Sequence, residues 1–139
     1  MSRSATLMFA ASLMLGSHLA RAEGWSCGPD LEVQCTAESC AVSEDQGVIP
    51  IYLSFDSRGN FLLCAYSGCW EGKGKVVSSS PFLVITKKQV DWSDPNQRVE
   101  GREDVLIAFS PSDKVVMVKA GSIAMPMRCS IGPGPDVGT

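Results

Sequence analysis

Apolar and polar residues alternate one by one along much of the chain between residues 48 and 130. The clearest run places apolar side chains at every second position: Ile49, Ile51, Leu53 and Phe55. This period of two is typical of a strand with one buried face. Asp-Ser-Arg-Gly at residues 56–59 then predicts a turn in which Gly59 supplies a positive φ, with residues 60–66 returning as the hairpin partner.

The same pattern predicts further short strands in the rest of this region: 75–79, 82–87, 104–109, 114–119 and 122–128. Residues 68–74 contain three glycines and are expected to break the chain. No window repeats apolar residues at the i, i+3, i+4 spacing of a helix. We therefore expect an all-β fold, an antiparallel meander of seven or eight short strands that forms a small barrel-like fold, with a β-sandwich as the alternative.

Two prolines bear on how such a barrel closes. Pro50 lies in the first expected strand and Pro126 in the last. Proline is confined to edge strands, strand starts and bulges because it has no N–H to donate. If these two strands meet, we expect a weak seam between them.

Composition divides the chain into four parts. Residues 1–22 are expected to be a signal peptide, and residues 23–47 a cysteine-pinned extended segment with little regular structure. The β-domain covers residues 48–130. Residues 131–139 carry three glycines and two prolines and are expected to be a flexible tail.

The signal peptide is predicted from three features in order. Arg3 gives a basic start, an apolar stretch runs from Leu7 to Leu15, and Ala20-Arg21-Ala22 is a small-x-small cleavage site. The apolar stretch is shorter than the roughly 20 residues that span a bilayer, so an uncleaved anchor is the weaker alternative. We expect a secreted protein, periplasmic or extracellular, without a membrane span after cleavage.

Removal of residues 1–22 changes the composition. The removed segment contains His18, the only histidine, and two arginines. The remaining 117 residues therefore have a formal net charge of 10 − 15 = −5, compared with −3 for the whole chain. A chain without histidine has no histidine general base and no histidine metal ligand. Its acidic charge argues against nucleic-acid binding, which needs a basic surface. We expect no enzyme activity, no cofactor and no bound metal.

All six cysteines remain after this cleavage: Cys27, Cys35, Cys40, Cys64, Cys69 and Cys129. An even number in a short exported chain predicts three structural disulfides. The sequence does not choose among the connectivities, although two Cys-x4-Cys spacings are each able to close a local loop. An exchanging thiol and a thiolate metal site are the weaker alternatives.

Two regions stand out as candidate partner contacts. Trp70 follows Cys69 directly; packing against a disulfide is the favoured interpretation, and an exposed binding anchor is the alternative. The polar stretch 91–104 is expected to be a long surface loop. Its candidate contact residues are Trp92, Asp94, Arg98 and Arg102.

Two metal sites are disfavoured alternatives. The oxygens of Asp91, Asp94, Asn96 and Glu100 suit calcium, but their spacing is not that of an EF-hand loop. Met117, Met125 and Met127 suit a copper(I) site, but core filling is the favoured role for methionines on alternate strand positions.

We expect a non-enzymatic protein that acts by protein–protein contact, for example as an inhibitor of an envelope-directed enzyme such as a lysozyme or a protease. The main alternative is a small-molecule carrier whose cavity is lined by alternating apolar residues: Phe61, Leu63, Phe82, Val84, Ile107 and Met117. The second alternative is a thiol–disulfide exchange factor.

Overall fold

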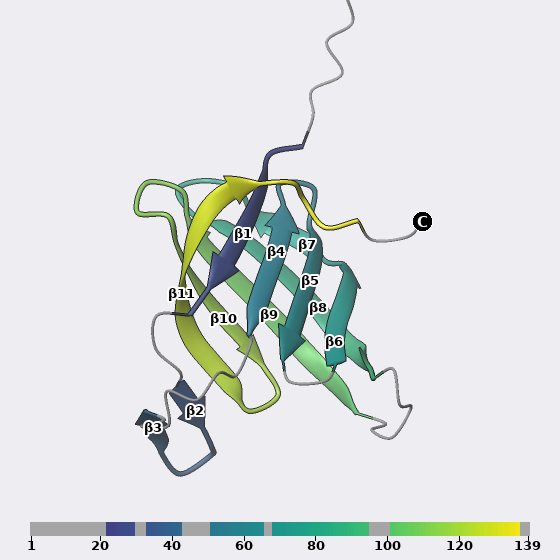
Figure 1. The fold of residues 1–139 in the computed structure, drawn as a ribbon, viewed down its shortest axis with the longest axis vertical. Coiled ribbons are helices and arrows are strands. Elements are labelled where there is room, and N and C mark those ends of the chain that lie inside the picture. The colour runs from purple at the N-terminus through teal and green to yellow at the C-terminus, as the bar shows by residue number, and fades with distance from the viewer. Residues whose placement is uncertain (1–21, 30–32, 43–50, 66–67, 95–100, 137–139) are drawn as a thin grey trace, which may run out of the picture.

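The computed structural model of the chain describes residues 22–29, 33–42, 51–65, 68–94 and 101–136, and these form a closed antiparallel β-barrel (Figure 1). The barrel wall consists of eight strands: β1 (Gly24–Gly28), β4 (Tyr52–Asp56), β5 (Asn60–Ala65), β6 (Gly68–Lys73), β8 (Leu83–Ser93), β9 (Arg102–Ser110), β10 (Val115–Ala120) and β11 (Ile123–Gly132). The all-β barrel prediction is confirmed, and the sandwich alternative is wrong.

From β4 onward the barrel is a meander, in which each strand pairs with a strand close to it in sequence. β7 (Lys75–Ser78) continues from β6 past Gly74 and pairs with the first half of β8. β1 is the exception to the sequential order. It lies between β4 and β11 and pairs antiparallel with both, which closes the barrel.

Side chains from the inward positions fill the barrel. At the end where β1 begins, Trp25, Phe55 and Phe109 pack with ring centroids 4.8–5.2 Å apart. Fully buried aliphatic side chains occupy the middle: Leu53, Leu63, Ile85, Ile107, Val116, Met125 and Met127. Burying one such side chain contributes about 1.5–3 kcal/mol, so this interior is the main source of stability.

The β4–β5 turn shows why the sequence folds locally as expected. Gly59 has φ +91°, in the region that favours glycine. The buried carboxylate of Asp56 accepts the backbone N–H groups of Arg58 and Asn60 at 2.9 and 3.0 Å, and the Asn60 side-chain amide at 2.8 Å. These bonds satisfy N–H donors that, in the tight turn, cannot pair with the backbone of the neighbouring strand.

All six cysteines form disulfides, and each disulfide joins residues directly opposite one another in a strand pair. Cys27–Cys129 joins β1 to β11, and Cys64–Cys69 joins β5 to β6. Cys35–Cys40 joins the short hairpin of β2 (Val33–Cys35) and β3 (Cys40–Val42), which lies outside the wall at the lower left of Figure 1. The prediction of three disulfides is confirmed.

Three segments differ from the sequence expectations. The first strand of the barrel, Gly24–Gly28, lies in the segment expected to have little regular structure. Gly68–Lys73 does not break the sheet but forms β6. Both ends of the 91–104 stretch are strand, because β8 extends to Ser93 and β9 begins at Arg102. In each case cross-strand pairing orders a sequence too polar or too rich in glycine to predict a strand by itself.

The prediction of a weak seam between the first and last strands is wrong, because β1 lies between β4 and β11 and pairs with both. Pro126 pairs with Met117 of β10 on one side. On the other side it falls between the part of β11 that pairs with β2, at Ile123, and the part that pairs with β1, from Arg128. A residue without an N–H is tolerated at such an unpaired edge. Pro50 and the expected signal peptide, up to residue 21, lie outside the described residues.

No helix occurs in the described part of the chain, and therefore none there is long and apolar enough to cross a membrane. β11 continues through Gly132, so the expected tail begins as a strand; residues 137–139 lie outside the described ranges.

Candidate functional site

One end of the barrel, at the bottom of Figure 1, brings together the end of β5, the start of β6, the end of β8, the start of β9 and the β10–β11 turn. It contains a pocket of about 240 Å³, lined by Ala65, Trp70, Trp92, Gly101, Glu103, Ser122 and Ile123. We call these seven residues the tryptophan end. Its walls are mainly apolar, and Glu103 is the one ionisable side chain among them.

Trp70 and Trp92 form the aromatic wall of this pocket. They lie directly opposite one another where β6 pairs with β8, and their ring centroids are 4.3 Å apart at an interplanar angle of 64°. Trp70 also lies opposite the core residue Leu63, which places both rings on the inner side of the sheet. The two separate sequence candidates therefore belong to one site.

A β-bulge in β8 gives Trp92 its inward direction. Leu83 and Ile85 are buried inward positions, but the register shifts between Lys87 and Val90, and Gln89 there has φ +52°. A bulge places one extra residue in a strand. The buried positions consequently change from odd to even residue numbers, so that Val90 and Trp92 face the interior.

Gly68 makes room for the Trp92 ring. A Cβ atom at Gly68 would lie 2.3 Å from Cε2 of Trp92 and 2.6 Å from the carbonyl oxygen of Ser93. Only a residue without a side chain allows the indole to lie this close to the backbone of β6.

Trp70 is 8% exposed, and its indole Nε1 is a buried donor without an acceptor among the described residues. Buried tryptophan N–H groups usually have a partner, and leaving one unpaired costs about 1–3 kcal/mol. Packing against Trp92 therefore holds the ring in place despite an unsatisfied polar atom.

Glu103 occupies an inward position of β9, in series with the core residues Val105, Ile107 and Phe109. It is half-buried and has no ion pair or hydrogen bond within the described part of the chain. Its carboxyl carbon lies 3.5 Å from the position of a Cβ on Gly121. Lys119, on the adjacent strand, donates to the carbonyl oxygen of Gly121.

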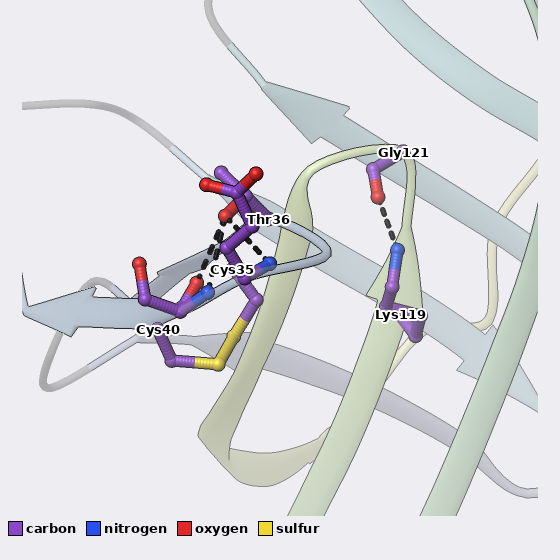
Figure 2. The surroundings of a disulfide bond; sticks show 7 residues. Cys35, Thr36, Cys40, Lys119 and Gly121 are labelled. Atoms are coloured by element: carbon purple, nitrogen blue, oxygen red, sulfur yellow. Dashed lines mark hydrogen bonds between the residues drawn. A yellow bond between two sulfur atoms is a disulfide. The ribbon is translucent and has the colours of Figure 1, made fainter.

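The β2–β3 hairpin lies beside the pocket. The backbone N–H of Cys35 donates to the carbonyl oxygen of Ser122 over 3.3 Å. Within the hairpin, Thr36 Oγ1 accepts the N–H groups of Glu38 and Ser39, both at 3.2 Å. Figure 2 shows this hairpin, with its Cys35–Cys40 disulfide, next to the β10–β11 turn.

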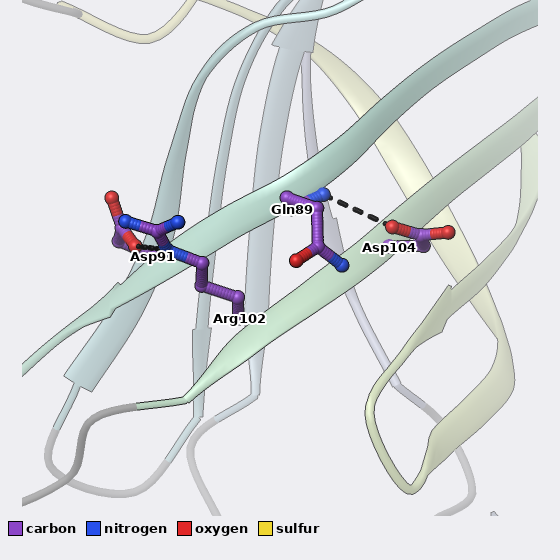
Figure 3. A network of polar contacts seen from close by, with 4 residues as sticks. All are labelled: Gln89, Asp91, Arg102 and Asp104. Atoms are coloured by element: carbon purple, nitrogen blue, oxygen red, sulfur yellow. Dashed lines mark hydrogen bonds and ion pairs between the residues drawn. The ribbon is translucent and has the colours of Figure 1, made fainter.

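Asp91 of β8 and Arg102 and Asp104 of β9 lie on the outer surface (Figure 3). Arg102 Nε donates to Asp91 over 2.7 Å, and the backbone N–H of Gln89 donates to Asp104 over 3.0 Å. The paired side chains of Arg102 and Asp91 are 66% and 75% exposed, so their ion pair adds little stability.

The other sequence candidates are distributed as follows. Asp94, half-buried, follows the last residue of β8, and Arg102 faces outward from β9. Arg98, like Asn96 and Glu100 of the calcium hypothesis, lies outside the described residues. No group of three or more His, Cys, Asp or Glu side chains that suits a metal occurs in the described ranges. Met125 and Met127 are buried in the core, while Met117 is 52% exposed.

The residues proposed to line a carrier cavity do not do so. Phe61, Leu63 and Ile107 are fully buried in the packed core, whereas Phe82 is 52% exposed. Val84, Ala108, Met117 and Pro126 instead form an apolar row across the outer wall, from β8 to β11. The alternation placed five of the six expected lining residues on strands correctly, but Phe82 precedes β8, and Val84 and Met117 were assigned to the wrong side of the wall.

A second hollow, of about 390 Å³, lies between residues 22–24 and 131–134 at the opposite end. Glycine and proline make up much of its wall, and it has no aromatic side chain. Without an aromatic anchor, it is not a candidate site.

The fold and the pocket together define a class: a small disulfide-linked, eight-stranded antiparallel β-barrel with a tryptophan-lined pocket at one end. No protein-family model, no characterised protein and no solved structure matches the chain. The function is therefore inferred from the residues of the chain itself.

Proposed function

We propose that this is an exported, non-enzymatic protein that binds another protein through the tryptophan end of its barrel. The observation that carries the proposal is a filled interior with a tryptophan-lined pocket of about 240 Å³ at one end of the barrel. Pockets for drug-sized ligands typically hold about 300–1,000 Å³. A smaller pocket on a rigid wall suits a single side chain that projects from a partner.

The chemistry of the wall supports this proposal. Tryptophan is enriched among the residues that dominate binding energy at protein interfaces. Trp70 lies next to the Cys64–Cys69 disulfide, and Trp92 lies against the backbone of Gly68. Both rings are thus held before a partner arrives, which lowers the entropic cost of binding.

Composition and the disulfides support the proposed compartment and the proposed class of partner. Three intramolecular disulfides are compatible with an oxidising compartment outside the cytoplasm. The charge of −5 after removal of residues 1–22 favours encounter with a basic protein. Inhibition of an envelope-directed enzyme, such as a lysozyme or a protease, is the specific form that we propose.

The test uses a photo-crosslinking amino acid in the oxidised protein of residues 23–139, at Ser122 on the rim of the pocket. The matched control position is Ser112, which is exposed on the β9–β10 turn at the opposite end of the barrel. We expect a crosslinked protein from Ser122 only, and we expect inhibition of a lysozyme or protease that binds in this way.

Two variants assign the contact to a surface. Trp92→Ala should abolish the crosslink, whereas Met117→Ala on the outer apolar row should leave it unchanged. Equal crosslinking from both positions, or a partner lost with Met117→Ala and kept with Trp92→Ala, contradicts the proposal. So does the absence of any crosslink combined with the absence of inhibition.

A further inference from the structure

We infer that the tryptophan end is a binding site for a cationic group, a guanidinium or an alkylammonium on an apolar stem. This inference rests on the proposed function where the group belongs to a partner protein, and it names the side chain that enters the pocket: arginine or lysine. A free organic amine carries the same chemistry and is the second source.

The first argument concerns Glu103. A carboxylate that is half-buried without a partner loses part of its hydration and gains nothing in return. Among the described residues Glu103 has no such partner, and the other inward members of its series are apolar. A cation in the pocket would supply the missing charge-assisted hydrogen bonds, which are among the stronger ones in proteins.

The second argument concerns the two indoles. A guanidinium or ammonium group within about 6 Å of a tryptophan ring is attracted by the electrons of the ring face. Trp70 and Trp92 line the same pocket as Glu103, and their rings are tilted by 64° to one another. Because the rings are tilted, one occupant contacts two aromatic surfaces with different orientations. The cationic group and the methylene stem of the ligand are therefore both able to pack against an indole.

The third argument concerns selectivity. An anion in this pocket would be repelled by Glu103, and a neutral apolar ligand would remove water from the carboxylate without pairing it. The volume of about 240 Å³ corresponds to roughly eight water molecules at about 30 Å³ each. That space fits the few heavy atoms of an arginine or lysine side chain.

Indole N–H signals in an NMR titration provide the test, because the protein without its signal peptide contains three tryptophans. Trp70 and Trp92 report the pocket, and Trp25, in the core at the opposite end, is the internal reference. The peptide probe is N-acetyl-arginine methylamide, with the citrulline analogue as its neutral control. The free-amine probes are agmatine and tetramethylammonium.

We expect the arginine probe to shift the Trp70 and Trp92 signals saturably and to leave Trp25 unchanged. The citrulline analogue should cause no shift. Glu103→Gln should weaken binding about tenfold or more, because it removes the charge but keeps the shape. Asp113→Asn, which removes an exposed carboxylate on the β9–β10 turn at the opposite end, is the matched control and should bind as the wild type does.

Each remaining outcome decides a separate claim. Equal binding of arginine and citrulline probes, no shift with any cation, or full binding by Glu103→Gln overturns the inference. If a crosslinked partner is then still lost with Trp92→Ala, the proposed function stands without it. If only free amines bind, dependent on Glu103, and there is neither a protein crosslink at Ser122 nor inhibition, the cation site stands and the proposed function is contradicted.

Discussion

Gly68 decides how the aromatic wall of the pocket is built. Its Cα lies under the ring of Trp92, and the space that a Cβ would need is already filled by ring and backbone atoms. Proteins do not accommodate added atoms at such a position without moving their neighbours. The smallest residue in the sheet thus fixes the position of one of the largest.

Gly68→Ala should displace Trp92 and lower the free energy of unfolding by about 1–3 kcal/mol, the usual cost of overpacking. Denaturant unfolding of the oxidised protein measures this loss, and tryptophan emission should shift to longer wavelength as the ring becomes more exposed. Gly28→Ala is the control, since a Cβ there meets no atom within 4 Å. An unchanged midpoint and emission in Gly68→Ala would show that the ring is not held as described.

At the scale of single residues, the sequence indicates candidate site residues but not which of them are in contact in the folded protein. Trp70 and Trp92 were each singled out, yet their contact depends on the register of β6 with β8, which no local pattern encodes. Glu103 was not selected, because it belongs to a stretch rich in charged residues. The sequence signal for Glu103 is its position two residues before Val105 and four before Ile107, which places it on the same inward face of the strand.

Among the elements, β8 departs most from its expected form. The inward apolar positions of β8 are odd-numbered up to Ile85 and even-numbered from Val90. Such a change of phase is the sequence signature of a bulge, but it equally resembles the end of a strand. The strand was therefore expected to stop at Lys87, and the pairing of Val90 and Asp91 with β9 was not predicted.

Gln89→Gly should stabilise this bulge. The left-handed conformation at φ +52° costs a residue with a side chain about 1–2 kcal/mol, while glycine loses about 0.5–1 kcal/mol more entropy on folding. The net effect is a rise of roughly 0.5–1 kcal/mol in the free energy of unfolding, measured by denaturant titration. The backbone N–H bond to Asp104 is kept.

Lys88→Gly, at the neighbouring position without a positive φ, serves as the control for this substitution. It should lower the free energy of unfolding by about 0.5–1 kcal/mol, because it adds only the entropy of glycine. A Gln89→Gly protein no more stable than the wild type would contradict the role given to this residue.

Strands with clear alternation, such as β4, β9 and β10, are predictable because their inward residues are mainly apolar. β1 was not, because its five residues include two glycines and only two inward apolar side chains, Trp25 and Cys27. Its conformation depends on two neighbours that are distant in sequence, so only tertiary pairing makes it a strand.

For the whole molecule, closure of the barrel depends on β1 and on the Cys27–Cys129 bond. This disulfide spans 102 residues, whereas each of the other two spans five. In the chain-entropy account, a crosslink restricts the unfolded chain more when it closes a longer loop. The three bonds therefore contribute unequally, although each joins two facing residues in the same way.

Replacing Cys27 and Cys129 together by alanine should lower the free energy of unfolding by about 4–5 kcal/mol. The same replacement of Cys64 and Cys69 should cost about 2 kcal/mol, as should that of Cys35 and Cys40. Denaturant unfolding of the three double variants, each with its remaining bonds oxidised, gives the comparison. Equal losses in all three would contradict this ranking.

The position of β1 also determines the order in which the disulfides are able to form during synthesis. Among the described strands β1 is synthesised first, and the strand that it must pair with, β11, is synthesised last. Until β11 is synthesised, the Cys27 thiol has no native partner. The cysteines of the two Cys-x4-Cys loops are already able to form their disulfides at that stage. A molecule that carries the Cys27–Cys129 bond has therefore completed β11 and placed it beside β1, so this single crosslink records that assembly is finished.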